Sequence, residues 1–343
     1  MEKTRKRRGT GRVTLQEVAN FAGVGTMTVS RALRTPEQVS DKLREKIEQA
    51  VEELGYIPNR TAGALASGHS DTVAVLVPSL TDKASSRFMQ SLQQVLNKNE
   101  FQLLLGCHEY NQLKEAEILM TLLQGNPAAL VIFGSQLADK THQILEKTNI
   151  PTINVVGSPF SPAQITIETA FFEASHKLTE HLLEQGYKNI GFIGAHMDNH
   201  LQRQQLNGWH KAMLSHYQNS DLVITMPDAA SLQLGRYALN EILLRQPELD
   251  AVICSHEEIA LGIMFECQRR LLKIPENIAV ACLDGSDNCD QTHPTLTSIR
   301  IDYKKMGIET GKLLIGLLNN NHDESEESRI VQFNYQIELR QST

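Results

Sequence analysis

The chain has 343 residues, 41% of them hydrophobic, so it is long enough for two or three compact units with buried cores. Its formal net charge of −7 hides an asymmetry, because residues 1–68 carry +4 and residues 69–343 carry −11. A basic head on an acidic body is typical of a nucleic-acid-binding module fused to another domain. The chain has neither a run of ~18 apolar residues nor a signal-peptide h-region, so we expect an unanchored cytoplasmic protein.

Residues 1–12 form a basic arm, and residues 13–58 carry three short helical patterns. The first covers 15–22, the second 26–33, and the third follows Ser40 as N-cap and ends at Gly55. The pattern predicts a small all-α helix-turn-helix domain. Residues 59–71 read as a linker with weak helical potential at 61–66.

From residue 72 onward, apolar runs of four to eight residues alternate with amphipathic helices. This order predicts βαβ units around buried parallel sheets. The units occur in two consecutive sets, which favours two doubly wound subdomains with a ligand between them. We expect the first at about 72–168 and 300–326, and the second at about 169–299 and 327–343. A late helix at 305–318 and a single last strand, "RIVQFNYQIEL", complete the prediction.

Motifs for catalysis and metal binding are missing from the sequence. It has no G-x-G-x-x-G after the first strand, no P-loop and no G-x-S-x-G. "HEEIA" at 256 resembles the start of a zinc-protease motif, but Ala260 stands where the second histidine is needed. His196 and His200 fit a surface pair better than a metal site, and the five cysteines have no zinc-finger spacing. We expect no enzyme, metal or cofactor, and buried thiols in a reducing cytosol.

The stretch "VTLQEVANFAGVGTMTVSRAL" reads as helix, tight turn and helix. With Val29 and Leu33 facing the first helix, the second leaves hydroxyls, Met27 and Arg31 pointing outward. Such a surface fits the DNA major groove, because hydroxyls reach phosphates and Arg reads guanine. Taken alone, the stretch also fits an ordinary helical hairpin with an exposed arginine.

Together with "VSDKLREKIEQAVEELGYIPNRTAGALA", this stretch resembles the N-terminus of the LacI/GalR family of bacterial repressors. "VAVLVPSLTD", "LDAVICSHEEIALGIMFECQRR", "IPENIAVACLDG" and "PTLTSIRIDYKKMG" are similar, in order, to the family's effector-binding core. The likeness implies a periplasmic-binding-protein-like fold for that core. "MTVSR", "LGYIPNR", "PSLTD" and "FECQRR" are most similar to repressors of gluconate and related sugar-acid operons.

The resemblance assigns DNA contacts by position. Thr26, Met27 and Arg31 would read bases, and Thr28, Ser30 and Asn59 would contact phosphates. Residues 61–66, with Ala62, would form a hinge helix, and Leu65 would enter the minor groove. Gly25 departs from the family's Ser or Thr cap before the recognition helix. A homodimer on a pseudo-palindromic operator in double-stranded DNA follows as the expected assembly, because the chain does not end in a leucine heptad helix.

For the effector, the resemblance points to a sugar acid bound in the core, where the Asp284 carboxylate would accept two hydroxyls. Gln205 replaces the family's cleft arginine, and Arg203 is the expected substitute. Glu168 and His256 also differ from the usual residues, and both fit a reading as polar loop residues. The full expected set is Ser79, Ser85, Glu168, Arg203, Gln205, His256 and Asp284.

Alternatives remain open at this stage. A regulator of the same class could take a neutral sugar or a purine as effector. A sugar carrier shares the fold of the core, although the helix-turn-helix head and missing signal peptide oppose it. Fold alone does not exclude an enzyme.

Overall fold

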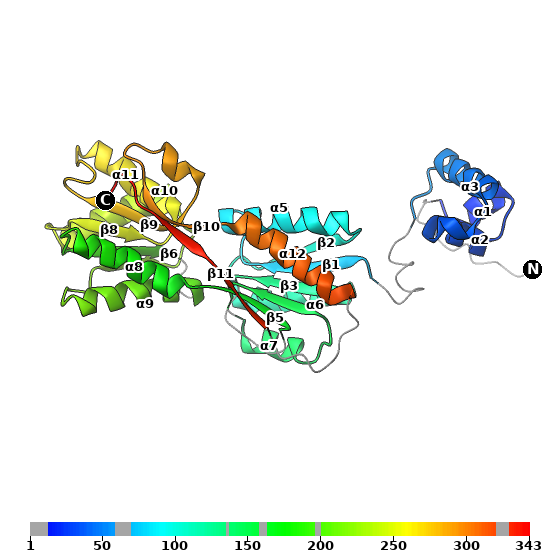
Figure 1. Cartoon of the computed structure of the whole chain (residues 1–343), viewed down its shortest axis with the longest axis horizontal. Coiled ribbons are helices and arrows are strands. Elements are labelled where there is room, and N and C mark those ends of the chain that lie inside the picture. The colour runs from blue at the N-terminus through cyan, green and yellow to red at the C-terminus, as the bar shows by residue number, and fades with distance from the viewer. Residues whose placement is uncertain (1–12, 59–69, 135–136, 158–162, 196–199, 320–328) are drawn as a thin grey trace, which may run out of the picture. The chain divides into compact units, whose positions relative to one another are not determined.

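The computed structural model describes residues 13–58, 70–134, 137–157, 163–195, 200–319 and 329–343. The chain divides into two compact units, residues 1–69 and residues 70–343 (Figure 1). The predicted basic arm, nearly all of the predicted hinge and linker, and residues 320–328 lie outside the described residues. In the described part of the chain, no helix is long and apolar enough to cross a membrane.

The first unit confirms the predicted helix-turn-helix head. A capping box begins its first helix: Thr14 accepts a hydrogen bond from the Glu17 backbone, and the Glu17 carboxylate accepts one from the Thr14 backbone. Small and branched side chains form the core, namely Val18, Ala19, Ala22, Val29, Ala32, Ile47 and Ala50. The elements are α1 (Leu15–Ala22), α2 (Thr26–Arg34), η1 (Pro36–Gln38) and α3 (Asp41–Leu54).

The second unit, which we call the core, contains two six-stranded sheets, each with helices on both faces (Figure 1). All strands of the first sheet are parallel, in the order β11-β5-β4-β3-β1-β2. Its strands are β1 (Thr72–Val77), β2 (Gln102–Cys107), β3 (Ala129–Phe133), β4 (Thr152–Val155), β5 (Ile165–Thr169) and β11 (Arg329–Phe333). Its helices are α5 (Lys83–Lys98), α6 (Gln112–Gln124), α7 (Asp139–Leu145) and α12 (Tyr303–Asn319).

The second sheet has the order β12-β10-β9-β8-β6-β7, and its edge strand β12 is antiparallel to β10. Its strands are β6 (Ile190–Ala195), β7 (Val223–Met226), β8 (Ala251–Cys254), β9 (Ala279–Gly285), β10 (Thr297–Ile301) and β12 (Tyr335–Glu338). Its helices are α8 (Phe171–Glu184), α9 (His200–Ser215), α10 (Leu232–Arg245), α11 (Glu257–Arg269) and the 3₁₀ turn η2 (Asp287–Gln291). Each sheet and its helices form one lobe of this unit, the first lobe around the first sheet and the second lobe around the second sheet. The two lobes confirm the predicted doubly wound fold.

Alternation along β1 shows why the sheets are buried on both faces. Val73, Val75 and Val77 pack into a core cluster with Phe88 of α5, whereas the intervening residues pack toward α6 and α7. The first cluster extends through both lobes and includes the fully buried Trp209 of α9. The two lobes therefore share one continuous apolar layer.

The chain passes between the lobes three times, each time through one residue between two elements. Ala170 separates β5 from α8, Asp302 separates β10 from α12, and Asn334 separates β11 from β12. The last crossing corrects the sequence-based division, which gave residues 327–343 to the second lobe. Since β11 pairs with β5, residues 329–333 belong to the first sheet, and the predicted single last strand is two strands in different sheets (Figure 1).

Three further elements differ from prediction. Strands β5 and β10 were not predicted, and α5 begins at Lys83, whereas the helical pattern of the sequence predicts residues 88–98. Residues 83–87, "KASSR", lack the apolar periodicity that marks a helix, because only Ala84 of this segment packs against the hydrophobic cluster. The rest of the segment borders a cavity.

Gly23 provides a test of the turn between α1 and α2. Its φ of 63° lies in the left-handed region, which costs an L-residue about 1–2 kcal/mol. A Cβ would find its nearest neighbour at 3.6 Å, so the cost is conformational rather than steric. We expect Gly23→Ala to lower the free energy of unfolding of the head by about 1 kcal/mol. Hydrogen exchange of residues 13–58 in the full-length chain measures it.

Gly25 is the matched control. Its φ is −77°, and as N-cap of α2 it offers no side-chain hydrogen bond. Gly25→Ser should stabilise the head by a few tenths of a kcal/mol by capping α2. Equal destabilisation by both substitutions would contradict the assignment of the strained turn to Gly23.

Candidate functional site

The first unit presents one side of α2 to solvent. Val29 and Ala32 face the hydrophobic interior of the first unit, whereas Met27 is 74% exposed and Arg31 is exposed. No described residue forms an ion pair with the Arg31 guanidinium. The hydroxyl residues Thr26, Thr28 and Ser30 are partly buried on the same short helix. A cation, a thioether and hydroxyls at the start of one helix are suited to phosphates and base edges.

No acidic residue lies in the first turn of α2, so its positive helix end is not neutralised there. The other predicted DNA contacts, Asn59, Ala62 and Leu65, lie outside the described residues.

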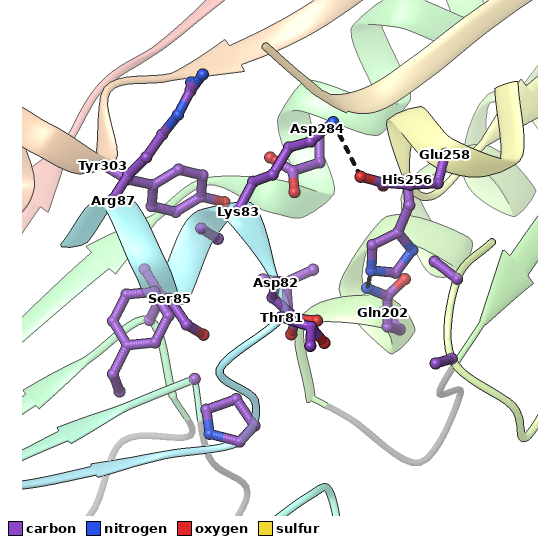
Figure 2. Close-up of a pocket in the computed structure, with 18 of the residues that line it drawn as sticks. Thr81, Asp82, Lys83, Ser85, Arg87, Gln202, His256, Glu258, Asp284 and Tyr303 are labelled. Atoms are coloured by element: carbon purple, nitrogen blue, oxygen red, sulfur yellow. Dashed lines mark hydrogen bonds and ion pairs between the residues drawn. The ribbon is translucent and has the colours of Figure 1, made fainter. Parts of the chain in front are cut away.

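The core contains a cavity of about 170 Å³ between its two lobes (Figure 2). The first lobe contributes the start of α5 and the ends of β3 and β4, and the second contributes residues after β7, β8 and β9. Because parallel strands place their carboxyl ends at one edge, loops far apart in sequence meet here. The polar side chains of the lining are Thr81, Asp82, Lys83, Ser85, Arg87, Tyr110, Gln202, His256, Glu258, Asp284, Ser286 and Tyr303.

Two cations from α5 form ion pairs across the cavity. Lys83 Nζ lies 2.5 Å from Glu257 Oε1 and 2.9 Å from Glu258 Oε1, both on α11 (Figure 2). Burial lowers the pKa of Lys83, but the two carboxylates outweigh burial and raise it. One turn along, Arg87 lies 3.6 Å from Asp287 of η2, which also pairs with Arg300. These pairs join the first lobe to the second.

Glu257 is the anchor of this arrangement. Its side chain is 1% exposed, and it accepts hydrogen bonds from Lys83, from the backbone N–H of Ser286 at 2.7 Å and from Asn288 Nδ2 at 2.9 Å. Burial opposes its ionised form, but these donors outweigh burial and lower the pKa of the carboxyl. Glu257 is therefore a fixed negative charge behind the cavity wall.

Asp284 behaves in the opposite way. Burial, assisted by the negative charges of Glu258 and Glu257, raises the pKa of its carboxyl to about 7. A hydrogen bond with Tyr303 opposes this rise only partly, and Figure 2 shows the Tyr303 ring directed at the same part of the cavity. Tyr303 directly follows Asp302, the second point at which the chain passes between the lobes. Asp284 is therefore hydrogen-bonded to a residue beside this crossing.

Two buried polar atoms in the lining have no hydrogen-bond partner among the described residues: Ser85 Oγ and Gln202 Oε1. Ser85 is 1% exposed and Gln202 is 4% exposed. Gln202 Nε2 lies 3.4 Å from His256 Nε2, and His256 Nδ1 lies 2.8 Å from Ser255 Oγ. Because unsatisfied buried polar atoms are costly, both atoms suit a ligand that brings hydroxyl groups.

The structure brings together three of the seven residues expected to bind the effector. Ser85, His256 and Asp284 line the cavity, whereas Ser79, Glu168, Arg203 and Gln205 do not. The Ser79 hydroxyl accepts hydrogen bonds from the backbone of Thr81 and Asp82, so it shapes the turn before α5.

The other three residues have positions outside the lining. Gln205 is buried and donates to the Leu283 carbonyl at 3.4 Å, which fastens α9 to β9. Glu168 accepts from Gln332 of β11, and Arg203 is exposed on α9. The cations that line this cavity are therefore Lys83 and Arg87 of α5, whereas the expected Arg203 lies outside the lining.

The sequence contained a signal for these missed cations. Residues 82–87 begin the helix that follows the first strand of a βα unit, and a parallel sheet binds its ligands beside such turns. Glu257 and Glu258 belong to "HEEIA", a stretch from which only His256 was expected to contact the effector. Among the described residues, no cluster of three or more His, Cys, Asp or Glu side chains is placed to hold a metal ion. His196 lies outside that part of the chain.

Comparisons with known proteins agree with this architecture. The family described as "Bacterial regulatory proteins, lacI family" matches residues 14–59, and "Periplasmic binding protein-like domain" matches residues 179–343. The HTH-type transcriptional regulator GntR of Escherichia coli K12 is 33% identical over 86% of this chain and 89% of its own. Such relatives are transcriptional regulators and not enzymes.

Solved structures show the same fold. A PurR family transcriptional regulator from Vibrio parahaemolyticus is 39% identical, with a TM-score of 0.72 over 79% of this chain and 98% of its own. The Lac repressor dimer bound to operator and an anti-inducer has a TM-score of 0.81 over 97% of this chain and 99% of its own, and its 24% identity shows the fold alone.

The raised pKa of Asp284 predicts a pH dependence of core stability. Between about pH 4 and pH 7 the folded state binds more protons at this carboxyl than the unfolded state, so stability falls as pH rises. We expect Asp284→Asn to remove this component. The resulting difference between pH 5 and pH 7.5 should be on the order of 2 kcal/mol, less than the full shift would give because the carboxyl is partly exposed.

Urea unfolding followed by fluorescence of Trp209, the single tryptophan, measures this difference in the core. Glu309→Gln, on the exposed side of α12, is the control and should keep the wild-type pH profile. A wild-type profile in Asp284→Asn as well would show that the carboxyl titrates normally.

Proposed function

The chain belongs to the lacI family of bacterial regulatory proteins, and on this premise we propose that it is a repressor of a carbohydrate-utilisation operon, controlled by a sugar acid such as gluconate. The exposed side of α2, with Met27 and Arg31, supports the DNA-binding part of this function. The cavity supports the effector part, since it combines carboxylates that accept hydroxyl hydrogen bonds with two cations that attract an acid. Similarity to a gluconate-type regulator agrees with both.

On operator DNA, Thr26, Met27 and Arg31 would read base edges, and Thr28, Ser30 and Asn59 would contact phosphates. Residues 61–66, with Ala62 and Leu65, would form a hinge helix whose leucine enters the minor groove. We propose a cytoplasmic homodimer, because two heads related by a two-fold axis match a pseudo-palindromic site.

A neutral sugar is the competing effector. Asp82, Glu258 and Asp284 all line the cavity, and three acidic side chains favour uncharged hydroxyls over a ligand carboxylate. Comparison of gluconate with an uncharged polyol of the same length separates the two.

Arg31→Ala tests the DNA-binding surface. A bidentate contact from Arg31 to guanine would be worth about 1–3 kcal/mol of discrimination, so its loss should weaken operator binding and flatten the preference between sequences. Fluorescence anisotropy with the operator and with scrambled DNA measures both effects. Thr28→Ala, at an expected phosphate contact, should weaken all sequences alike. If Arg31→Ala also weakens all sequences alike, Arg31 contacts phosphate only.

Asp284→Ala tests the effector site. Loss of the carboxylate removes acceptors for effector hydroxyls, so gluconate should no longer change operator affinity, whereas operator affinity without gluconate should stay the same. Anisotropy titrations with and without gluconate, at fixed salt, measure the two quantities. An unaltered gluconate response in this variant would place the effector outside the cavity.

A further inference from the structure

Lys83 has two carboxylate partners that differ in exposure and in their other hydrogen bonds. Both lie on α11, but Glu257 is 1% exposed and Glu258 is 35% exposed. Glu257 also accepts from Ser286, Asn288 and the Cys289 thiol, so its position is fixed by the second lobe itself. Among the described residues, Lys83 is the hydrogen-bonding partner of the Glu258 carboxylate. Glu257 is therefore held in place without Lys83, whereas Glu258 is the carboxylate that a ligand can replace on Lys83.

Glu258 also faces the cavity, whereas Glu257 does not line it. Figure 2 shows the Lys83 side chain reaching across from α5 to Glu258 at the cavity wall. A ligand in the cavity therefore meets Lys83 on the side that Glu258 occupies. Displaced from Lys83, Glu258 is exposed enough to be hydrated, so the exchange leaves no buried charge unpaired.

Arg87, one turn further along α5, also pairs with a carboxylate of the second lobe. Its partner Asp287 keeps Arg300 as a second partner, so Arg87 can turn to a ligand without leaving a carboxylate unpaired. The first lobe thus presents two cations whose present partners are either replaceable or doubly paired.

We infer that Glu258 is a built-in substitute for the anionic group of the effector: a ligand carboxylate or phosphate takes its place on Lys83, while Glu257 keeps Lys83 joined to the second lobe. This inference rests on the proposed function, in that the cavity binds a small-molecule effector. The exchange replaces one carboxylate–ammonium pair by another, so it favours anionic over neutral ligands even in an acidic cavity. A neutral polyol leaves the Lys83–Glu258 pair in place and gains no ion pair with the Lys83 ammonium.

A double-mutant cycle on the full-length protein tests this exchange. Calorimetric titrations use gluconate as the carboxylate probe, glucose 6-phosphate as the phosphate probe and sorbitol as the neutral probe. We expect Glu258→Gln to tighten binding of the anionic probe about 3- to 5-fold, because the competitor for Lys83 is lost. Lys83→Gln should weaken it about 10- to 100-fold, with little change for sorbitol.

The gain from Glu258→Gln should vanish in the Lys83→Gln background, since it acts through that ammonium. Asp82→Asn is the matched control: it removes an equal charge from the same lining, but the Asp82 carboxylate accepts from Tyr110. If Asp82→Asn tightens gluconate binding as much as Glu258→Gln, or if the gain survives without Lys83, the effect is the general charge of the cavity and the inference is wrong.

The outcomes separate this inference from the proposed function. If gluconate binds the wild type and shifts operator affinity while the cycle shows no coupling, the proposed function stands and the exchange is wrong. If only glucose 6-phosphate binds and the cycle shows coupling, the exchange stands with phosphate as the anion, and the sugar acid is wrong. If no anionic probe binds, the inference is overturned, whatever the result for operator DNA.

Discussion

The parallel pairing of the strands is the constraint on which the core depends. Parallel strands all end at the same edge, so the turns after β1, β3, β4, β8 and β9 meet although they lie far apart in sequence. The three single-residue crossings, at Ala170, Asp302 and Asn334, hold the two edges opposite each other. A rotation of one lobe against the other therefore changes many contacts across the cavity together. A ligand that touches both lobes can bias that rotation only by its differential affinity for the two arrangements.

Electrostatics divides the carboxylates of the cavity into two kinds. Glu257 receives hydrogen bonds from both lobes, and its pKa is lowered despite burial. Asp284 has one hydrogen-bonding hydroxyl beside it and other negative charges nearby, and its pKa is raised to about 7. The first is a permanent charge that holds Lys83. The second exchanges a proton near neutrality, so an anionic ligand placed near it would raise that pKa further and bind together with a proton.

Much of the fold could be predicted from the sequence because periodicity reports burial. The buried strands read as continuous apolar runs, and the capping and glycine signals placed the helices of the head within a residue or two. Prediction failed where a segment faces something other than a core. The first turn of α5 borders the cavity, so it has no apolar stripe, and Lys83 and Arg87 were missed with it. The break at Asn334 was not predicted, because apolar and polar residues alternate through both halves of the last segment as in one strand. Only the pairing partners of β11 and β12 distinguish the two strands.

The opposite net charges of the head and of residues 70–343 determine which part of the chain is attracted to DNA. Residues 70–343 carry −11, and the first 69 residues carry +4, so the core is repelled by DNA phosphates and the head supplies the attraction. The effector signal then does not need to dismantle an interface between core and DNA. In the dimer proposed above, it needs only to change how the two heads are held. A change of about 1 kcal/mol per head becomes about 2 kcal/mol when both heads occupy one operator, which is roughly a 30-fold change in affinity. A few exchanged ion pairs at Lys83 and Arg87 are of sufficient size to supply it.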